Sequence, residues 1–268
     1  MKQHVWQTRP LPHNLSLIKD AMENERRTEY NVDMRPEEDF LSDILSASQI
    51  RATDTYETPP QIIWIDNSTI ATLGNFSAST GKAKSKKTFN VSAIVAASLA
   101  GKQVLNYRAH LPEGKRKILY VDTEQSRFHC KRVLCRILRL AGLPTDTHPP
   151  LLEFLCLRGY ATKERLRKIE EAIYDLDDLG LVVIDGIRDL AHDINSPGEA
   201  TDLITKLMQW TDERRIHIHT VLHLNKGDDN TRGHLGTELN NKAETVLQIT
   251  KDDFDRDVSS VAAMHIRD

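Results

Sequence analysis

Short apolar strands alternate with helical segments from Gln61 to the end of this 268-residue sequence, and this alternation constrains the fold more than any other feature. Several of the strands, such as LVVID at Leu181–Asp185, are continuously apolar. Strands of this kind are buried on both faces, as in parallel sheets. Helices between such strands cover both faces of the sheet. We therefore predict an α/β domain over residues 59–268, with a mostly parallel sheet.

The expected elements follow one another along the chain in a regular order. Strands are expected at Ile62–Ile65, Ile70–Ser79 with a bend at Gly74, Lys117–Asp122, Leu181–Asp185, Ile216–Leu224, Thr245–Thr250 and Val258–Ile266, the last two as a terminal pair. Helices are expected at Thr88–Ala100, Arg127–Ala141, Glu164–Leu176 and around Ala200–Arg214. The sequence stops directly after an expected strand, so we also expect a domain truncated at its C-terminus.

Residues 1–58 differ in character, because they are polar and contain no long strand-like run. Pro36 followed by acids suits a helix start. Apolar residues then recur at helical spacing, from Phe40 to Leu45, and predict a short amphipathic helix that extends to about Arg51. Thr58-Pro59-Pro60 predicts the boundary with the domain at 59–268. This N-terminal helical segment is either a solvated tail or a segment that docks on a neighbour.

A Gly/Lys/Ser loop lies between the second expected strand and the first expected helix. Its residues are Gly81, Lys82, Ala83, Lys84, Ser85, Lys86, Lys87 and Thr88. They fit G-x-x-x-x-G-K-[ST] except at Lys86, which replaces the second glycine. Such a loop turns backbone N–H groups toward phosphates at a helix N-terminus. Lys87 would reach the β- and γ-phosphates of ATP, and the Thr88 hydroxyl would bind Mg²⁺.

Two alternatives to this phosphate loop remain open. In a competing register Lys82 is the phosphate lysine, but Ala83 then takes the place of the metal ligand, so we favour Lys87. The loop is otherwise a solvated basic turn. A non-glycine residue at Lys86 can adopt a left-handed conformation at a cost of about 1–2 kcal/mol.

Acids follow two of the expected strands. Asp185 ends LVVID at the carboxyl edge of the sheet, where open α/β folds bind ligands, and can hold Mg²⁺ through its water shell. Glu124 comes just after the strand Lys117–Asp122 and is suited to orient or deprotonate an attacking water. For each acid by itself, a structural role as a strand-end acid satisfied by a cap or turn is favoured. A phosphate loop followed by both, in this order, favours a nucleotide hydrolase.

This order of motifs resembles the RecA-like P-loop ATPases over Gln61–Asp268. It is most similar to the ATPases of RepA- and DnaB-type hexameric helicases and their relatives on mobile elements. The resemblance implies a RecA-like fold, ATP and Mg²⁺ as cofactors, and hydrolysis of ATP. It also implies that Glu124 is the catalytic glutamate, Asp185 the aspartate of the metal site, and His223 the polar residue that senses the γ-phosphate.

The same resemblance implies partners. Gly227–Thr237 would be a mobile loop that faces DNA, single-stranded by preference, in the centre of a ring. Arg267 falls where the similar helicases place an arginine finger that reaches the ATP of the neighbouring subunit; Arg232 and Lys226 are weaker candidates. A homo-oligomer, with a hexamer as the family example, is therefore expected.

Composition excludes some classes and leaves others open. No apolar run approaches the ~20 residues of a membrane helix, and the first residues lack the apolar core of a secretion signal. Three cysteines without a CxxC pair indicate reduced thiols and a cytoplasmic protein. The net charge of −3 gives no general attraction to nucleic acid, so a DNA contact would require a local basic surface or an assembled ring.

Two further side-chain patterns each allow more than one interpretation. His217, His219 and His223 share one face of a strand, and we favour core and sensor roles over zinc binding. Arg132, Arg136 and Arg139 line one face of their helix, as a solvated face or as a contact with DNA or a subunit.

Two function hypotheses follow. The first is an ATP-driven, DNA-associated motor, either a replicative helicase or a related ATPase of a mobile element, and Glu124 favours it. The second is a nucleotide-binding regulatory module with little turnover that controls partner assembly, which Lys86 favours mildly. A small-molecule kinase is disfavoured, because the sequence has no evident Arg-rich lid.

Overall fold

The computed structural model describes residues 45–46, 48–224, 233–255 and 257–266. The chain divides into two units, Met1–Glu57 and Thr58–Asp268. In the first unit, Leu45, Ser46 and Ser48 are helical. The helix expected to extend to about Arg51 ends earlier, because Gln49, Ile50 and Arg51 are not helical. Phe40 and the other expected helix residues before Leu45 lie outside the described residues.

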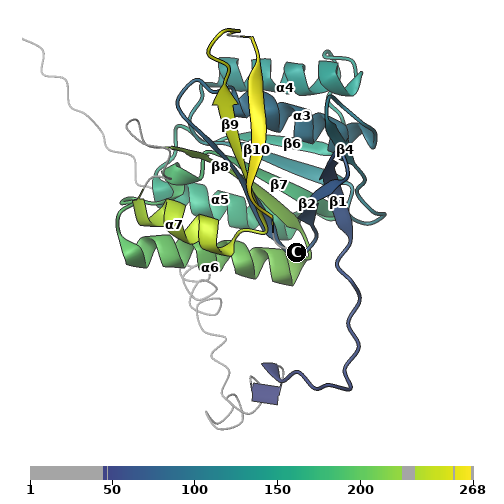
Figure 1. The fold of residues 1–268 in the computed structure, drawn as a ribbon, viewed down its shortest axis with the longest axis vertical. Helices are drawn as coiled ribbons and strands as arrows, with labels where there is room; N and C mark the ends of the chain where they lie inside the picture. The colour runs from purple at the N-terminus through teal and green to yellow at the C-terminus, as the bar shows by residue number, and fades with distance from the viewer. Residues whose placement is uncertain (1–44, 47, 225–232, 256, 267–268) are drawn as a thin grey trace, which may run out of the picture. The chain divides into compact units, whose positions relative to one another are not determined.

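The second unit contains a seven-stranded sheet in the order β10-β9-β3-β8-β7-β5-β6 (Figure 1). Its strands are β3 (Phe76–Gly81), β5 (Lys117–Asp122), β6 (Leu152–Cys156), β7 (Leu179–Asp185), β8 (His217–His223), β9 (Thr245–Lys251) and β10 (Ser259–Ile266). Every neighbouring pair is parallel except β9 and β10, which form the expected antiparallel terminal pair. The predicted α/β fold with a mostly parallel sheet is therefore confirmed.

Helices cover both faces of this sheet. Their bounds are α3 (Lys87–Ala100), α4 (Arg127–Ala141), α5 (Thr162–Asp175), α6 (Pro197–Arg214) and α7 (Gly233–Lys242), with a 3₁₀ turn η1 at Ile187–Leu190. Figure 1 shows α3 and α4 on one face and α5, α6 and α7 on the other. Each face accordingly has its own hydrophobic core cluster.

A second, three-stranded sheet lies beside the main one, and part of the predicted strand arrangement was wrong because it did not include this sheet. It has the order β2-β1-β4, from β1 (Gln61–Ile65), β2 (Ser68–Thr72) and β4 (Tyr107–Ala109). The strand expected at Ile62–Ile65 thus does not join the main sheet. The strand expected at Ile70–Ser79 is divided between the two sheets at Gly74, whose φ of 87° is readily adopted by glycine.

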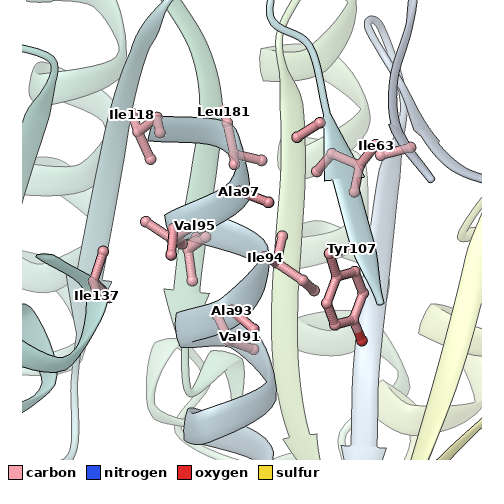
Figure 2. Close-up of a cluster of buried hydrophobic side chains, with 14 of the residues drawn as sticks. Ile63, Val91, Ala93, Ile94, Val95, Ala97, Tyr107, Ile118, Ile137 and Leu181 are labelled. Carbon is pink, nitrogen blue, oxygen red and sulfur yellow. The ribbon is translucent and has the colours of Figure 1, made fainter. Parts of the chain in front are cut away.

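Helix α3 is the centre of the core on its side of the sheet. Its sequence KTFNVSAIVAASLA buries Val91, Ile94 and Val95 completely. Figure 2 shows these side chains between Ile118 of the main sheet and Tyr107 of the small sheet. The helix that follows the phosphate loop is therefore fixed by apolar packing on both sheets.

A buried hydrogen-bonded chain of polar side chains crosses β3 and β8. His217 Nδ1 lies 2.8 Å from the carbonyl oxygen of Thr72, which only accepts, so this nitrogen carries the proton. His217 Nε2 then accepts from Ser77 Oγ at 2.7 Å. Ser77 Oγ, having donated its proton, accepts from His219 Nδ1 at 2.8 Å, and His219 Nε2 accepts from Ser79 Oγ at 2.8 Å.

The chain continues into α3 and the small sheet. Asn90 Nδ2 donates to Ser79 Oγ at 3.4 Å, and the Tyr107 hydroxyl donates to Asn90 Oδ1 at 2.6 Å. Every hydrogen bond in this arrangement is donated toward the Thr72 end of the chain, and both histidines are neutral. His217 and His219 therefore have the core role that was favoured for them over zinc binding.

This geometry predicts a pH dependence of stability. Burial, and then the neighbouring His217, lower the pKa of His219 to about 3. Because that pKa is below the value of about 6.5 in the unfolded chain, His219 contributes stability above pH 6.5 and loses it as the pH falls toward 3. Because the folded protein keeps His219 unprotonated, the free energy of unfolding should fall by about 1.4 kcal/mol for each pH unit below 6.5.

The measurement is the free energy of unfolding by urea between pH 5 and pH 7. His219→Asn removes the titrating group and should make the dependence on pH shallower by about that slope. His148→Asn, which changes an exposed histidine, is the matched control and should leave the slope unchanged. An unchanged slope in His219→Asn would contradict the conclusion that His219 is neutral in the folded protein.

Candidate functional site

The carboxyl ends of four neighbouring parallel strands meet at one edge of the main sheet. In the register, Gly81 at the end of β3 pairs with His223 of β8, and Asp122 at the end of β5 pairs with Asp185 of β7. A cavity of about 220 Å³ lies at this edge. It is lined by Lys87, Thr88, Asp122, Glu124, Gln125, Val133, Arg136, Asp185 and His223. Residues predicted from four separate sequence segments are thus brought together.

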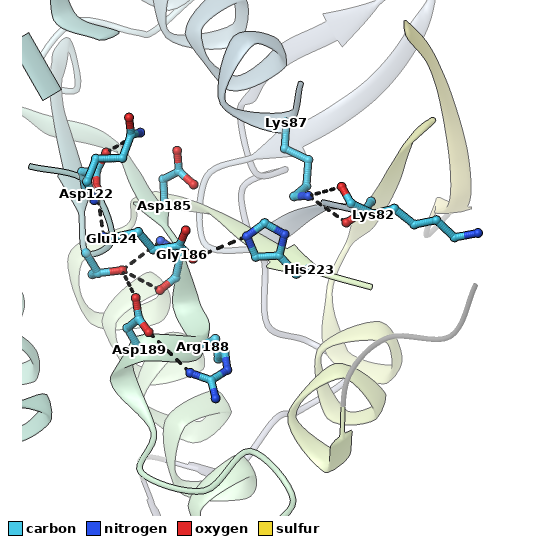
Figure 3. A network of polar contacts seen from close by, with 12 residues as sticks. Lys82, Lys87, Asp122, Glu124, Asp185, Gly186, Arg188, Asp189 and His223 are labelled. Atoms are coloured by element: carbon cyan, nitrogen blue, oxygen red, sulfur yellow. Dashed lines mark hydrogen bonds and ion pairs between the residues drawn. The ribbon is translucent and has the colours of Figure 1, made fainter. Parts of the chain in front are cut away.

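Lys87 is held inside the Gly81–Thr88 loop. Its Nζ donates to the carbonyl oxygens of Gly81 at 2.7 Å and of Lys82 at 2.9 Å, and its side chain is nearly buried (Figure 3). Lys82 is exposed. At Gly81, a Cβ would collide with the carbonyl oxygen of Ile249, so the close approach of β9 requires glycine there. The geometry favours the Lys87 register over the Lys82 register.

Lys86 adopts a backbone conformation that glycine adopts more readily than other residues. Its φ and ψ are 68° and 28°, in the left-handed region. Its Nζ lies 3.7 Å from Asp257 Oδ1 in the β9–β10 turn. Nearby, the Ser259 hydroxyl donates to the Ser85 carbonyl oxygen at 3.2 Å. Two contacts from this hairpin therefore support the loop at its unusual residue.

Other loop positions differ in exposure. Ala83 and Lys84 are exposed, and Lys84 also has a positive φ, 65°. Ser85 is buried, and its Oγ has no hydrogen-bond partner among the described residues. An unpartnered buried hydroxyl inside a loop of this kind is a candidate ligand contact.

Asp185 is buried at the floor of the cavity. It accepts from the Tyr120 hydroxyl at 2.9 Å and is hydrogen-bonded to the Thr88 side chain. Burial, and then the charge of Asp122, raise the pKa of Asp185 to about 6. A cation beside Asp185 and Thr88 would offset that penalty, because it favours the ionised carboxylate.

Glu124 and His223 face each other across the cavity (Figure 3). Glu124 Oε1 lies 3.5 Å from His223 Nε2. The hydrogen bond to His223 is the largest effect on the pKa of Glu124, which is lowered, and Lys87 acts in the same direction. Glu124 is therefore ionised at neutral pH and able to accept a hydrogen bond. His223 Nδ1 is buried without a partner among the described residues.

Sequence reasoning did not identify Asp122 as part of this site. Its carboxylate is fully buried and accepts from the backbone N–H groups of Glu124 at 3.0 Å and Gln125 at 2.7 Å. The Gln125 side-chain amide donates to it at 2.9 Å. This turn directs Glu124 out of the strand and into the cavity. An Asp that caps N–H groups two and three residues later is a recognisable turn signal in the sequence.

Gln125 and Arg136 also line the cavity without having been assigned to it. Arg136 was considered only as part of a basic helix face. Its guanidinium lies 5.7 Å from the centre of the Phe89 ring. No pattern in the sequence relates α4 to this cavity, because the link depends on how α4 packs on α3.

The remaining predicted residues fall mostly outside the described part of the chain. Arg267, Arg232 and Lys226 are in this group. The mobile loop expected at Gly227–Thr237 is wrong over its last residues, because α7 begins at Gly233. Leu235 and Leu239, four residues apart, are completely buried there, and this apolar pair holds the segment in a helix.

Comparisons with known proteins agree with this architecture. A family model described as an AAA domain matches residues 42–229. The crystal structure of the RadB recombinase matches with a TM-score of 0.51 and 17% sequence identity, over 73% of this chain and 82% of that chain. The fold is RecA-like. No curated protein matches the sequence. Within the described residues, no helix has the length and apolarity needed to cross a membrane.

The loop geometry gives a test of register. Lys87→Ala is expected to abolish nucleotide binding, because it removes the buried cation at the start of α3. Lys82→Ala, the matched control on an exposed side chain, is expected to weaken binding only modestly. Binding of fluorescently labelled ATP measures both variants. Equal losses, or a greater loss in Lys82→Ala, would mean that the register is wrong.

Proposed function

The chain belongs to the AAA domain family, and from this premise we propose that it binds Mg–ATP in the cavity at the carboxyl edge of the main sheet and hydrolyses it. One observation carries the proposal. The buried lysine of a loop before α3, a hydroxyl, a buried aspartate, an ionised glutamate and a histidine all line one cavity of about 220 Å³. Phosphoryl transfer needs a cation, a metal site and a residue that positions water.

The residues present fit a nucleotide phosphate and its metal. Lys87 is held by two carbonyl oxygens of its own loop, contacts that a phosphate would replace with stronger, charge-assisted ones. Thr88 and Asp185 would hold Mg²⁺, directly and through water. Bound Mg²⁺ would supply positive charge to the transferring phosphate.

The size of the cavity bears on how a nucleotide sits. Ordinary small-molecule pockets measure ~300–1,000 Å³, whereas this one measures about 220 Å³. We therefore propose that the cavity holds the phosphates and metal, with the base and ribose toward the open surface. This supports the proposal of a homo-oligomer in which a neighbouring subunit covers the nucleotide. Arg267, outside the described residues, stays our candidate for the residue supplied by that neighbour.

Glu124 is proposed to orient the attacking water and accept its proton. Its lowered pKa keeps it ionised, as a hydrogen-bond acceptor must be. His223 is proposed to sense the γ-phosphate, because it lies between Glu124 and the loop and its Nδ1 lacks a partner among the described residues. A change at the phosphate would reach Glu124 through the 3.5 Å contact between their side chains.

Glu124→Gln tests the catalytic assignment. The substitution keeps the size of the side chain and removes its charge, so Mg–ATP binding should persist while kcat falls about 10²–10⁴-fold. Steady-state phosphate release and labelled-ATP binding are measured on the same preparation. In contrast, Asp185→Asn should also shift the Mg²⁺ dependence. Turnover by Glu124→Gln at the wild-type rate would remove Glu124 from this role.

Beyond ATP hydrolysis itself, we propose that hydrolysis drives a DNA-associated motor. It is supported by the resemblance of the motif order to RepA- and DnaB-type helicase ATPases, and by a RecA-like fold similar to that of a recombinase. The alternative, a regulatory module with little turnover, is favoured by Lys86 in the phosphate loop. The ionised Glu124 beside His223 favours hydrolysis.

Single-stranded DNA distinguishes these two functions. For a motor, the rate of ATP hydrolysis should rise several-fold when oligo-dT is added, and the rise should disappear in Lys87→Ala. Phosphate release with and without oligo-dT is the measurement, and an equal concentration of inorganic polyphosphate controls for simple charge. Negligible turnover under both conditions, with ATP binding intact, would support the regulatory module instead.

A further inference from the structure

Helix α4 follows Glu124 directly and carries an unusual charge pattern. Residues 125–145 contain five Lys or Arg residues and no Asp or Glu. The basic residues are Arg127, Lys131, Arg132, Arg136 and Arg139. The whole chain, in contrast, has a net charge of −3. Like charges three and four residues apart destabilise an isolated helix, so the pattern is unfavourable unless an anion compensates it.

The helix buries one face and exposes the basic one. Val133, Ile137 and Leu138 are buried against the core. Lys131, Arg132 and Arg139 are among the exposed cations on the opposite side. They surround a groove of about 430 Å³ that is lined entirely by residues of α4, including Phe128, Cys135 and Leu140. This outer basic face of α4 is therefore hollowed as well as charged.

None of the five cations forms an ion pair within the part of the chain that the structure describes. Helix α5 makes the contrast clear. There, Arg167 pairs with Glu171 at 3.4 Å and Arg165 approaches Asp189 at 3.9 Å. Two cations of α5 are thus compensated within the molecule, whereas those of α4 are available to a partner. An anionic partner is therefore indicated.

Phe128 indicates which kind of anion. Phe128 is 69% exposed at the margin of the basic groove, and its ring makes a T-shaped contact with that of His129. An aromatic ring exposed among cations is the arrangement that binds single-stranded nucleic acid, in which bases stack on the ring and phosphates contact the cations. A purely acidic peptide would use the cations but not the exposed ring face.

We propose that the outer basic face of α4 binds single-stranded nucleic acid, with Lys131, Arg132 and Arg139 on the phosphates and Phe128 against a base. The proposal deepens the proposed function, since it names where the nucleic-acid partner of the ATPase binds. It does not use the segment at 225–232.

The position of α4 links this surface to the nucleotide cavity. Gln125 and Ser126 alone separate Glu124 from the first residue of the helix. Arg136 lines both the groove and the cavity. A nucleic-acid strand bound to α4 would therefore contact the helix that comes directly after the turn carrying Glu124. This gives a physical route by which nucleic acid would change the rate of hydrolysis.

The experiment measures binding of fluorescein-labelled oligo-dT by anisotropy over a series of salt concentrations. Each phosphate contact on a single strand contributes about 0.7 to the slope of log K against log salt concentration. The double variant Arg132→Ala/Arg139→Ala should therefore lower that slope by about 1.4 and weaken binding roughly tenfold or more at 0.1 M salt. Lys163→Ala/Arg167→Ala, two exposed cations of α5, is the matched control and should change neither.

Phe128→Ala separates stacking from charge. It should weaken binding roughly tenfold without changing the salt slope, and Phe128→Trp should restore it. Equal effects of the α4 and α5 double variants would overturn the proposal. So would unchanged oligo-dT binding in the α4 variant together with a loss of self-association in sedimentation, because α4 would then be a protein interface.

Basal ATP hydrolysis, measured without nucleic acid, keeps this test independent of the proposed function. It should be the same in Arg132→Ala/Arg139→Ala as in the wild type, while stimulation by oligo-dT is lost. A wild-type protein that binds oligo-dT through α4 but does not hydrolyse ATP would contradict the proposed function and leave this inference standing. Normal stimulation by oligo-dT in Arg132→Ala/Arg139→Ala would overturn this inference.

Discussion

The in-register parallel pairing of β3, β8, β7 and β5 is the constraint on which the candidate site depends. Parallel strands end at the same edge, so residues from separate segments of the sequence become neighbours. Asp122 pairs with Asp185, and Gly81 with His223. Two buried acids side by side are unfavourable, and together with burial this raises the pKa of Asp185 to about 6. The pairing that stabilises the sheet thus creates a site that favours a cation.

Much of this fold could be predicted from the sequence because its strands are short and apolar. Lys117–Asp122 and Arg127–Ala141 have the predicted bounds. Strand β6, LEFLC, was missed because it contains a glutamate and owes its pairing to β5, and Tyr107–Ala109 is too short for a periodic pattern. In the site, Lys87 and Glu124 followed from motifs, whereas Asp122 and Arg136 did not. The turn at Asp122 is a local signal that was not used, whereas the position of Arg136 depends on how α4 packs, which local patterns do not encode.

Lys86 shows how a departure from a motif is accommodated. A non-glycine residue in the left-handed region costs about 1–2 kcal/mol, and Lys86 has a φ of 68°. An exposed ion pair contributes little by itself, so the contact with Asp257 is insufficient to offset this cost. The hydrogen bond from Ser259 to Ser85 and the packing of β9 against Gly81 fix the rest of the loop. Contacts from the β9–β10 hairpin therefore offset part of the conformational cost of having lysine in place of glycine.

Positive and negative charges lie in separate regions of this protein, and its net charge does not describe either region. Asp122 and Asp185 are buried at the sheet edge, while most of the cations of α4 are exposed on the next helix. Exposed cations act over about 8–10 Å at physiological salt, so they attract a polyanion without neutralising the buried acids. Arg136 belongs to both regions. A net charge of −3 is thus compatible with nucleic-acid binding, because a local surface, and not the sum over the chain, determines what a polyanion meets.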